Sequence, residues 1–547
     1  MKKFAAIAVS AVILFTGCDL AKYIPGVTPP VSDVTTESHT TATEAPPTTS
    51  EETTPSPPVI EPLPVYGETD IGEVSYDPTE CSTVYEAEDA SLTGYAKLAS
   101  FREGYSGSGY VSGISLPDSG MAVQLKIEAP QHYNITICAA SDTPVEGVLY
   151  VDGLARGKLS ISGSGKFEAV KYENIYLTPD EAVLSIQELS GECDIDFVLL
   201  ESSSSVYAHD YAASGKLSNM ASSERTIKTY KYLCEMYGEA VFSGQQCSQG
   251  SNAEIDAIAR VTGRYPAIRF GELMGYSEGF DTGDIELAID YAKQGGLVGY
   301  VWNWMQNGSC YREKSGFKLE NAVTTHEISK LSVDKLTELQ ASGGISGECL
   351  EIVKGIDLIA VQLKRLADEN IPVIFRPLPE AGNGEFWWSA DKDSYLWLYK
   401  LIYTRLTSYH MLNNIIWVWN AQDLDWYVGD EYCDIISLDI YDYSHGAWDN
   451  QSHINAMLRM SGLSADKPVA ISECNVLPGP ANIVKDDAYW LYASVWSGDY
   501  ALNQDGTLNE EYMLSTEWIM FYNCSEVLAR DEPVSYTHLT LPTNSRV

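Results

Sequence analysis

Residues 373–380 read VIFRPLPE, an apolar run that ends in a proline and a glutamate. Seven similar runs of five or six residues lie between residues 206 and 533, and amphipathic segments separate them. Apolar runs that alternate with helical segments predict parallel strands enclosed by helices, and eight such units predict a (β/α)8 TIM barrel. A doubly wound open sheet is the alternative. No G-x-G-x-x-G fingerprint follows the first run, however, and the sequence has no P-loop.

The predicted strands are 240–245, 267–271, 297–302, 373–377, 415–419, 435–440, 469–473 and 492–496. The clearest predicted helices are 224–237, 349–370, 394–409 and 509–522. In such a barrel the carboxyl ends of the strands form one face, and the active site is built there.

Residues 80–201 have a different pattern, with short alternating strands, glycine-rich turns and no strong helical periodicity. This pattern predicts an all-β jelly roll or β-sandwich that precedes the barrel. Its predicted strands include 123–127, 133–139, 147–151 and 182–186. Cys81 and Cys193 flank the module and could bridge its ends. A serine run at 202–205 separates it from the barrel domain at 206–533.

The two ends of the chain have compositions that do not predict a folded domain. Lys2 and Lys3 precede an apolar run that ends at Cys18, which resembles a bacterial lipobox in which Cys18 is lipidated. A plain secretory signal is the alternative for 1–18, and either interpretation predicts an extracellular or cell-surface protein. Residues 19–79 are rich in Thr, Pro and Ser and predict an extended linker. Residues 534–547 resemble a translated sequencing adapter, so we exclude this tail as non-native.

The charge balance limits the possible partners. The 547 residues include 35 Lys and Arg against 76 Asp and Glu, a formal net charge of −41. A polyanion repels nucleic acids and anionic membrane surfaces, so we expect neither as a partner and allow membrane contact only through the lipid anchor. With 35 Tyr and 12 Trp, the composition suits either sugar-stacking surfaces or an ordinary aromatic core. We expect a monomer.

Two glutamates follow predicted barrel strands. Glu380 follows the fourth strand and Glu473 ends the seventh, so both belong to the rim on roughly opposite sides of the mouth. Glycoside hydrolysis requires two such carboxyl groups, one protonated and one ionised. Either glutamate alone could instead form a structural ion pair.

The neighbours of the two glutamates predict different roles. Glu380 precedes an aromatic segment at 386–388, and an apolar wall raises a carboxyl pKa, so Glu380 is the predicted acid/base. A hydroxyl from Tyr441, at the end of the sixth strand, would orient Glu473 as the nucleophile. Arg376 lies on the same side of its strand as Glu380. It would orient and balance a carboxylate, or fill the barrel interior by ion pairing.

Two tryptophans end predicted strands at the barrel rim. Trp302 ends the third strand and Trp496 ends the eighth, so both are candidate platforms for a sugar ring. Each could equally belong to the aromatic core.

Over residues 206–530 these motifs together resemble glycoside hydrolase family 26. The motifs are IFRPLPEA at 374–381, FWW at 386–388, NIIWVWN at 414–420, GDEY at 429–432, LDIYD at 438–442 and SE at 472–473. The resemblance implies a retaining endo-β-1,4-mannanase that acts on neutral β-mannan and needs no cofactor for catalysis. It also implies that Glu380 is the proton donor, that Glu473 is the nucleophile, and that Tyr441 and Trp496 line the subsite of the attacked sugar.

Three positions depart from the family pattern. Pro379 and Asn303 stand where the family usually has histidine, and Glu385 stands where it commonly has tryptophan. All three positions touch substrate in typical members, so we include Asn303 among the substrate contacts, together with Arg376 and with Trp387 of the aromatic segment. The departures leave two alternatives open: hydrolysis of mixed-linkage glucan or xylan, and a non-catalytic glycan-binding lipoprotein.

The sandwich resembles carbohydrate-binding module families 35 and 6. The motifs are YEAEDA at 85–90, GYSGSGYV at 104–111 and DIDFV at 194–198. The resemblance implies a structural Ca²⁺ held by Glu86, Glu88 and Asp196, a choice of ligands that suits a hard cation. The alternative is that these three residues are ordinary surface acids.

Overall fold

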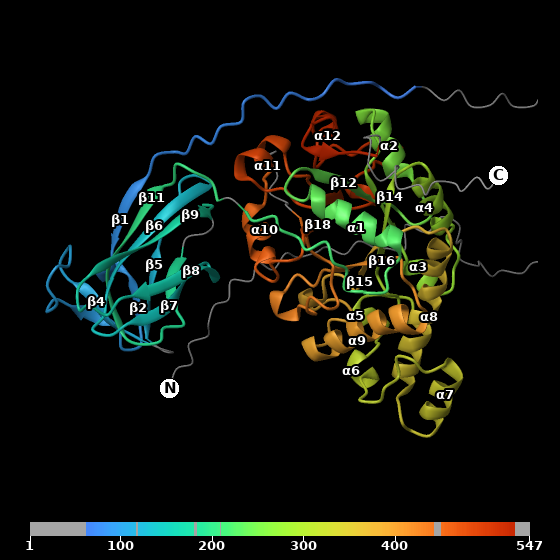
Figure 1. Cartoon of the computed structure of the whole chain (residues 1–547), viewed down its shortest axis with the longest axis horizontal. Helices are drawn as coiled ribbons and strands as arrows, with labels where there is room; N and C mark the ends of the chain where they lie inside the picture. Colours follow the sequence, from blue (N-terminus) through green and yellow to red (C-terminus); the bar gives the residue numbers. More distant parts are fainter. Residues whose placement is uncertain (1–61, 116–118, 180–182, 208, 442–449, 531–547) are drawn as a thin grey trace, which may run out of the picture. The chain divides into compact units, whose positions relative to one another are not determined.

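The computed structural model describes residues 62–115, 119–179, 183–207, 209–441 and 450–530 (Figure 1). The predicted signal peptide with Cys18, most of the linker and the tail at 534–547 lie outside these residues, as does Asp442. Residues 62–80 have no regular secondary structure.

Eight parallel strands close into a barrel at the predicted places. They are β12 (Val241–Gln246), β13 (Ile268–Glu272), β14 (Leu297–Trp302), β15 (Val373–Pro377), β16 (Ile415–Trp419), β17 (Ile435–Ile440), β18 (Val469–Cys474) and β19 (Tyr492–Val495). Each pairs with the next, and β12 pairs with both β19 and β13, so the sheet has no open ends and the doubly wound alternative is wrong. A short strand, β20 (Val527–Leu528), adds to β12.

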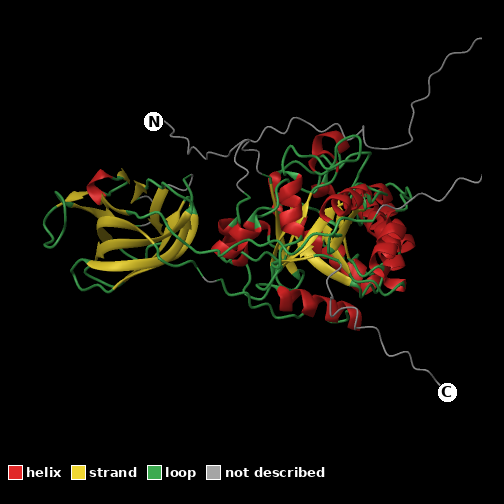
Figure 2. Ribbon diagram, turned by 90° about the horizontal axis from the view of Figure 1, so that it is seen from above, coloured by secondary structure: helices red, strands yellow, loops and turns green. Residues whose placement is uncertain are grey.

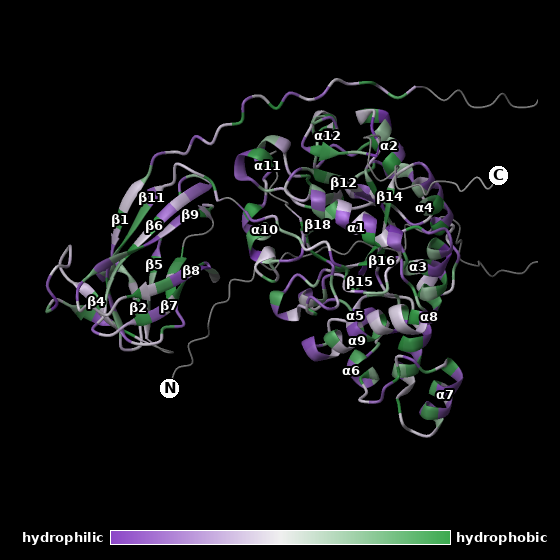
Figure 3. Cartoon of the chain, viewed as in Figure 1, coloured by the Kyte–Doolittle hydropathy of each residue, from purple (hydrophilic) through white to green (hydrophobic). Residues whose placement is uncertain are grey.

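Helices cover the outside of the barrel, so the strands are buried on both faces (Figure 2). The helices are α1 (Glu224–Met236), α2 (Ala253–Thr262), α4 (Asp284–Lys293), α8 (Gly347–Asp368), α9 (Lys392–Thr404), α10 (Ile454–Ser461), α11 (Pro480–Asp486) and α12 (Ser515–Tyr522). Most of them carry both hydrophilic and hydrophobic residues, as amphipathic helices do when one face packs on a core (Figure 3).

The helical layer departs from the predictions in four places. The predicted helix at 509–522 begins only at Ser515. The predicted helix at 394–409 is α-helical only to Thr404 and then continues as a π turn, Arg405–Tyr409. The connection from β16 to β17 has no α-helix, only the 3-10 turn Leu424–Trp426. Residues between β14 and α8 form three short helices that the periodicity did not reveal: α5 (Arg312–Ser315), α6 (Leu319–Ala322) and α7 (Val333–Ala341).

The N-terminal module is a β-sandwich of two antiparallel sheets, as predicted. One sheet contains β1 (Ser82–Glu86), β3 (Lys97–Ala99), β4 (Tyr110–Ile114), β11 (Cys193–Ser202), β6 (Gln131–Ala140) and β9 (Glu168–Leu177). The other contains β2 (Ser91–Thr93), β5 (Gly120–Gln124), β10 (Val183–Gln187), β7 (Val145–Val151) and β8 (Leu154–Ile161). Apolar side chains of the facing sheets form a separate hydrophobic core.

Cys81 and Cys193, which could have bridged the ends of the module, do not form a disulfide. Cys81 lies beside Ser202 at one end of β11, whereas Cys193 begins that strand. At about 3.3 Å per residue the two cysteines are about 30 Å apart, beyond the reach of a disulfide. Every cysteine in the described part of the chain is a free thiol.

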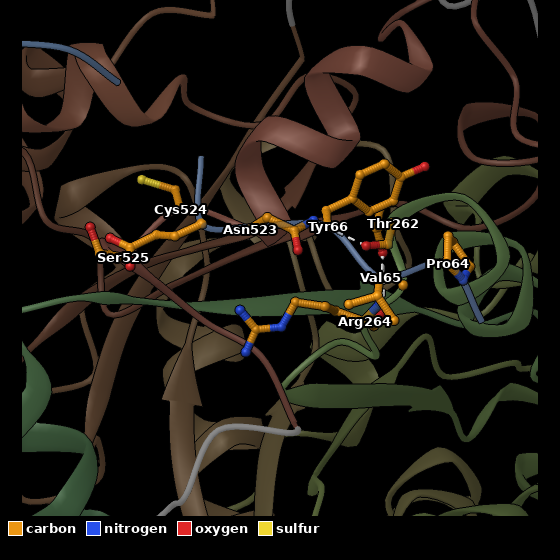
Figure 4. Close-up of a pocket in the computed structure, with 10 residues that line it drawn as sticks. Pro64, Val65, Tyr66, Thr262, Arg264, Asn523, Cys524 and Ser525 are labelled. Carbon is orange, nitrogen blue, oxygen red and sulfur yellow. Dashed lines mark hydrogen bonds between the residues drawn. The ribbon is translucent and has the colours of Figure 1, made fainter. Parts of the chain in front are cut away.

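A cavity of about 350 Å³ lies at the amino-terminal end of the barrel strands (Figure 4). Residues 64–66 and 68 line it together with residues 262–264, which precede β13, and residues 523–525, which precede β20. Thr69 N donates a hydrogen bond to Asn523 O at 2.7 Å and fixes the extended segment there. The cavity is therefore at the opposite end of the strands from the glutamates. Among the described helices, none combines the length and the apolar character needed to cross a bilayer.

Candidate active site

Glu380 is held in a strained turn at the carboxyl end of β15. Glu380 and Leu378 both have φ of 53°, the left-handed region that side chains with a Cβ adopt at a cost of about 1–3 kcal/mol. The Glu380 amide donates to Asn420 O at 2.7 Å and to Asn420 Oδ1 at 3.2 Å, so the strand that follows β15 stabilises this turn. Strain of this kind is typical of positions that must present a functional group.

The environment of Glu380 favours a carboxylic acid. Burial, followed by the charge of Glu473, raises the pKa of Glu380 to about 7. Gln422 Nε2 lies 3.5 Å from Glu380 Oε1. Trp388 Nε1 donates to Pro379 O at 2.9 Å, so the aromatic segment fixes the backbone next to Glu380. A pKa raised to about 7 suits a proton donor near neutral pH, which is the role predicted for Glu380.

Glu473 is buried on β18 and both of its carboxyl oxygens accept hydrogen bonds. Arg376 Nη2 donates to Oε1, and the Tyr441 hydroxyl donates to Oε2 at 2.7 Å. Two donors, one of them a guanidinium, form the environment of a carboxylate. The hydrogen bond expected between Tyr441 and Glu473 is therefore present.

Arg376 is an internal support for Glu473. Its Nη1 lies 3.1 Å from both oxygens of Asp439, and only 2% of its side chain is exposed. Asn420 Nδ2 donates to Asp439 Oδ1 at 3.0 Å, and the Gln422 side chain bonds both backbone groups of Asp439. Burial and the charge of Glu473 raise the pKa of Asp439 well above its usual value. Arg376 contacts two carboxyl groups, as its expected orienting role requires, and its burial leaves almost no surface for the expected contact with substrate.

Trp302, a predicted sugar platform, and Trp387, a predicted substrate contact, instead have rings that belong to the core. Trp302 and Trp387 have no exposed surface. Trp302 stacks on Trp304 with ring centroids 4.2 Å apart, and Trp387 Nε1 donates to Trp304 O at 2.6 Å. Trp496 is only half-buried at the end of β19, so its contact with substrate stays a prediction.

A third carboxyl group, which the sequence analysis missed, lies at the end of β13. Glu272 accepts hydrogen bonds from Asn303 Nδ2 at 2.7 Å and from the Met274 amide at 2.9 Å. Burial raises the pKa of Glu272 to about 7. Asn303 thus orients an acid at the carboxyl ends of the strands, and its contact with substrate stays a prediction. The sequence could have revealed Glu272 through its position, because it directly follows a predicted strand and so belongs to the rim of the barrel.

In the sandwich, the three expected calcium ligands meet at the turn 106–108. Ser106 Oγ donates to Glu86 Oε2 at 2.7 Å, Ser106 N donates to Asp196 Oδ1 at 2.9 Å, and Ser108 N donates to Glu88 Oε1 at 2.6 Å. A Cβ at Gly107 would lie 2.4 Å from Glu88 Oε1, so the cradle needs glycine there. Glu88 Oε2 is buried without a hydrogen-bond partner.

These three carboxylates supply the hard oxygen atoms that Ca²⁺ prefers. In this structure, the oxygen atoms of the three carboxylates do not surround a common point where an ion could be held. Within the described ranges, no group of three or more His, Cys, Asp or Glu side chains has the geometry to hold a metal ion.

Comparisons with known proteins agree with this geometry. The profile of Glycosyl hydrolase family 26 matches residues 218–524. The chain is 31% identical over 469 residues to a mannan endo-1,4-β-mannosidase of Thermothelomyces thermophilus, covering 83% of this chain and 91% of that protein. It is 28% identical over 479 residues to mannan endo-1,4-β-mannosidase B of Piromyces sp, covering 83% and 77%.

Two solved structures extend the likeness to the N-terminal sheets. A Podospora anserina GH26-CBM35 β-(1,4)-mannanase is 29% identical with a TM-score of 0.52, covering 83% of this chain and 99% of that one. A ruminal GH26 endo-β-1,4-mannanase, 22% identical with a TM-score of 0.59 over 83% and 98%, shares the fold. Because 83% exceeds the share of the chain that the barrel occupies, the likeness includes a CBM35-like module.

Proposed function

The chain belongs to glycosyl hydrolase family 26, and from that membership we propose that it is a retaining endo-β-1,4-mannanase. One observation supports the retaining mechanism in this proposal. Glu473 is held as a carboxylate by Arg376 and Tyr441, while Glu380, whose pKa is about 7, belongs to the same barrel mouth. The two environments separate the two carboxyl groups into a base and an acid, as glycosidic cleavage with retention requires.

In the first step, Glu380 gives its proton to the glycosidic oxygen as the bond from that oxygen to the anomeric carbon breaks. The Glu473 carboxylate forms a bond to the anomeric carbon, which yields a covalent glycosyl-enzyme and a free aglycone alcohol. Arg376 and Tyr441 hold Glu473 so that little reorientation is needed before attack.

In the second step, Glu380 is an ionised base. It takes a proton from water as the water oxygen bonds to the anomeric carbon, and the bond to Glu473 breaks. The sugar leaves with the configuration it had in the polymer, and both carboxyl groups return to their starting forms. Two inversions at one carbon therefore give retention.

The substrate we propose is a neutral β-mannan. The formal charge of −41 is compatible with a neutral polysaccharide, and each of the curated relatives described above is named a mannan endo-1,4-β-mannosidase. The CBM35-like module would raise the local concentration of polymer at the barrel. Asn303, Pro379 and Glu385 depart from the family pattern at substrate positions, so mixed-linkage glucan and xylan belong in the test.

A panel of soluble polysaccharides tests the proposal. Wild type should release reducing ends from mannan and little or nothing from mixed-linkage glucan or xylan. Glu380→Ala and Glu473→Ala should abolish the release, whereas Glu351→Ala, an exposed helix position, should match wild type. Cleavage of glucan or xylan alone would refute the mannan assignment. Equal mannan binding by wild type and Glu473→Ala without any cleavage would show a non-catalytic glycan-binding protein.

We propose that Glu86, Glu88 and Asp196 bind a structural Ca²⁺. Support comes from their meeting at one glycine-containing turn and from the unpartnered buried oxygen of Glu88. The ion would tie the first and last strands of the module together. Added CaCl2 should raise the thermal midpoint of the full chain relative to EDTA, and Glu88→Gln should remove that response. Equal midpoints in CaCl2 and EDTA would refute the site.

We propose that Cys18 carries a lipid and that the protein is held at the cell surface. The support is the apolar run that follows Lys2 and Lys3 and ends at Cys18. The full chain made in a bacterial host should partition with membranes, and its N-terminal peptide should show the mass of an acylated cysteine. Cys18→Ala should release it. A membrane-free wild type with an unmodified cysteine would refute the anchor.

A further inference from the structure

The side-chain amide of Gln422 is fixed by the backbone of a neighbouring strand. Gln422 is the third residue after β16 ends. Its Oε1 accepts a hydrogen bond from the Asp439 amide at 3.0 Å, and its Nε2 donates to Asp439 O at 2.8 Å. Because an N–H group needs an acceptor and a carbonyl needs a donor, these two bonds allow only one orientation of the amide. The orientation of Gln422 is therefore set by β17.

The amide nitrogen of Gln422 has a second hydrogen that Asp439 does not use. Gln422 Nε2 lies 3.5 Å from Glu380 Oε1. A flipped amide would bring Oε1, which cannot donate, toward that carboxyl group and would lose both bonds to Asp439. The second N–H is therefore available to the carboxyl group of the acid.

The backbone around Gln422 packs closely against the turn that carries Glu380. Gly382 N donates to Ala421 O at 2.8 Å, and a Cβ at Gly382 would lie only 2.6 Å from that oxygen. Gln422 has φ of 66°, so it is in the left-handed region, as Glu380 is. Strained backbone at both residues is typical of a site where the surrounding structure holds functional groups in place.

The charged groups around Glu380 leave Gln422 as the donor placed for it. Burial and then the charge of Glu473 raise the pKa of Glu380, whereas Arg376 and Gln422 lower it. Arg376 already donates to both Asp439 and Glu473. The titratable and charged groups that face Glu380 are Glu473, Arg376, Glu385, Asp439 and Tyr441.

We propose that Gln422 is a positioning residue that stabilises the ionised form of Glu380 as its proton moves to the glycosidic oxygen. The inference rests on the proposed function. When the O–H bond of Glu380 breaks, its electron pair stays on the carboxyl group, and the second N–H of Gln422 donates to the carboxylate. Such a donor binds a carboxylate more strongly than a neutral acid. Catalytic hydrogen bonds are often long in the free enzyme and shorten in the transition state.

Two substrates separate help given to the acid from general damage to the site. Gln422→Met should lower kcat/KM on soluble mannan about tenfold, because the leaving alcohol needs a proton. On 2,4-dinitrophenyl β-mannobioside, whose leaving group departs without a proton, the loss should be less than about threefold. Glu380→Ala should show the same difference more strongly. Gln187→Met, at an exposed position of the sandwich, is the matched control and should match wild type on both substrates.

The pH profile gives a second readout that a purely structural role would not change. Loss of a donor to the ionised form raises the pKa of Glu380. The pH above which kcat/KM on mannan falls should therefore move upward by about 0.5–1 unit in Gln422→Met.

Gln422→Glu tests the donor even if Gln422→Met does not fold. It keeps the shape of the side chain and the acceptor for the Asp439 amide. A protonated glutamate has one O–H, which can donate to Asp439 O and leaves none for Glu380. An ionised glutamate would repel the Glu380 carboxylate. In either form, the variant should move the limb of the pH profile upward at least as far as Gln422→Met does.

The outcomes separate this inference from the proposed function. If wild type cleaves no mannan, the proposed function fails, whatever the Gln422 variants do. If wild type cleaves mannan but the variants lose activity equally on both substrates with an unchanged pH profile, Gln422 has only a structural role and the inference is refuted. Unchanged kcat/KM on mannan in both variants also refutes it.

Discussion

Removal of the Arg376 guanidinium should destabilise the barrel and the active site together. Arg376 lies between Asp439 and Glu473, and all three side chains are almost completely buried. Arg376→Met would leave two buried carboxylates without their cation, and such a loss typically costs about 3–5 kcal/mol of unfolding free energy. The cost should fall when one of the two negative charges is also removed.

A double-mutant cycle with Asp439→Asn measures this coupling. The amide keeps the size of Asp439 and can still accept the hydrogen bond from Asn420, so we expect a cost of about 1–2 kcal/mol for Asp439→Asn alone. The loss of unfolding free energy in the double variant should be smaller than the sum of the two single losses by about 1–3 kcal/mol. Urea unfolding of the three variants and wild type provides the free energies.

Activity gives an independent readout of the same cycle. Arg376→Met should lower kcat by about a thousandfold because Glu473 loses its orienting cation. The double variant should regain stability without regaining kcat, since the guanidinium is absent in both. If the losses in the two single variants add up to the loss in the double variant within about 0.5 kcal/mol, the proposed ion network is refuted. So would a kcat near that of wild type in Arg376→Met.

Three further predictions concern the acid, the nucleophile and the sandwich. On soluble mannan, kcat/KM should fall above about pH 7, because Glu380 must be protonated in the free enzyme; a profile flat to about pH 9 would contradict this role. Tyr441→Phe removes the donor to Glu473 Oε2 and should lower kcat about 10–100-fold with a small change in urea midpoint, and an unchanged kcat would exclude the hydroxyl. His132 is buried with both ring nitrogens unpartnered, and burial lowers its pKa to about 4. The contribution of His132 to the unfolding free energy should therefore be constant above about pH 6.5 and decline by up to about 3 kcal/mol toward pH 4; His132→Phe should reduce that decline, and an identical pH dependence in this variant would refute it.

The sequence predicted the barrel and its two principal glutamates because both depend on local patterns. Strands of a parallel barrel are buried on both faces, so each is a continuous apolar run, and a residue such as Glu473 at the end of a run must belong to the rim. The orienting role of Tyr441 followed from the adjacency of β17 and β18. The order of the strands in the barrel therefore made it possible to predict spatial neighbours from positions in the sequence.

Other features depend on packing that no single run encodes. Trp302 ends a strand as a rim residue would, yet its ring stacks on Trp304 and is completely buried. Glu272 and Asn303 are 31 residues apart in the chain, and only the pairing of β13 with β14 brings them together.

Trapping the glycosyl-enzyme tests the central claim most directly. Wild type incubated with a 2-deoxy-2-fluoromannosyl fluoride should gain the mass of one fluorosugar, and the modified peptide should carry it on Glu473. Glu473→Ala should gain no mass under the same conditions. A label on any other residue, or an initial mannan product of inverted anomeric configuration, would contradict the account.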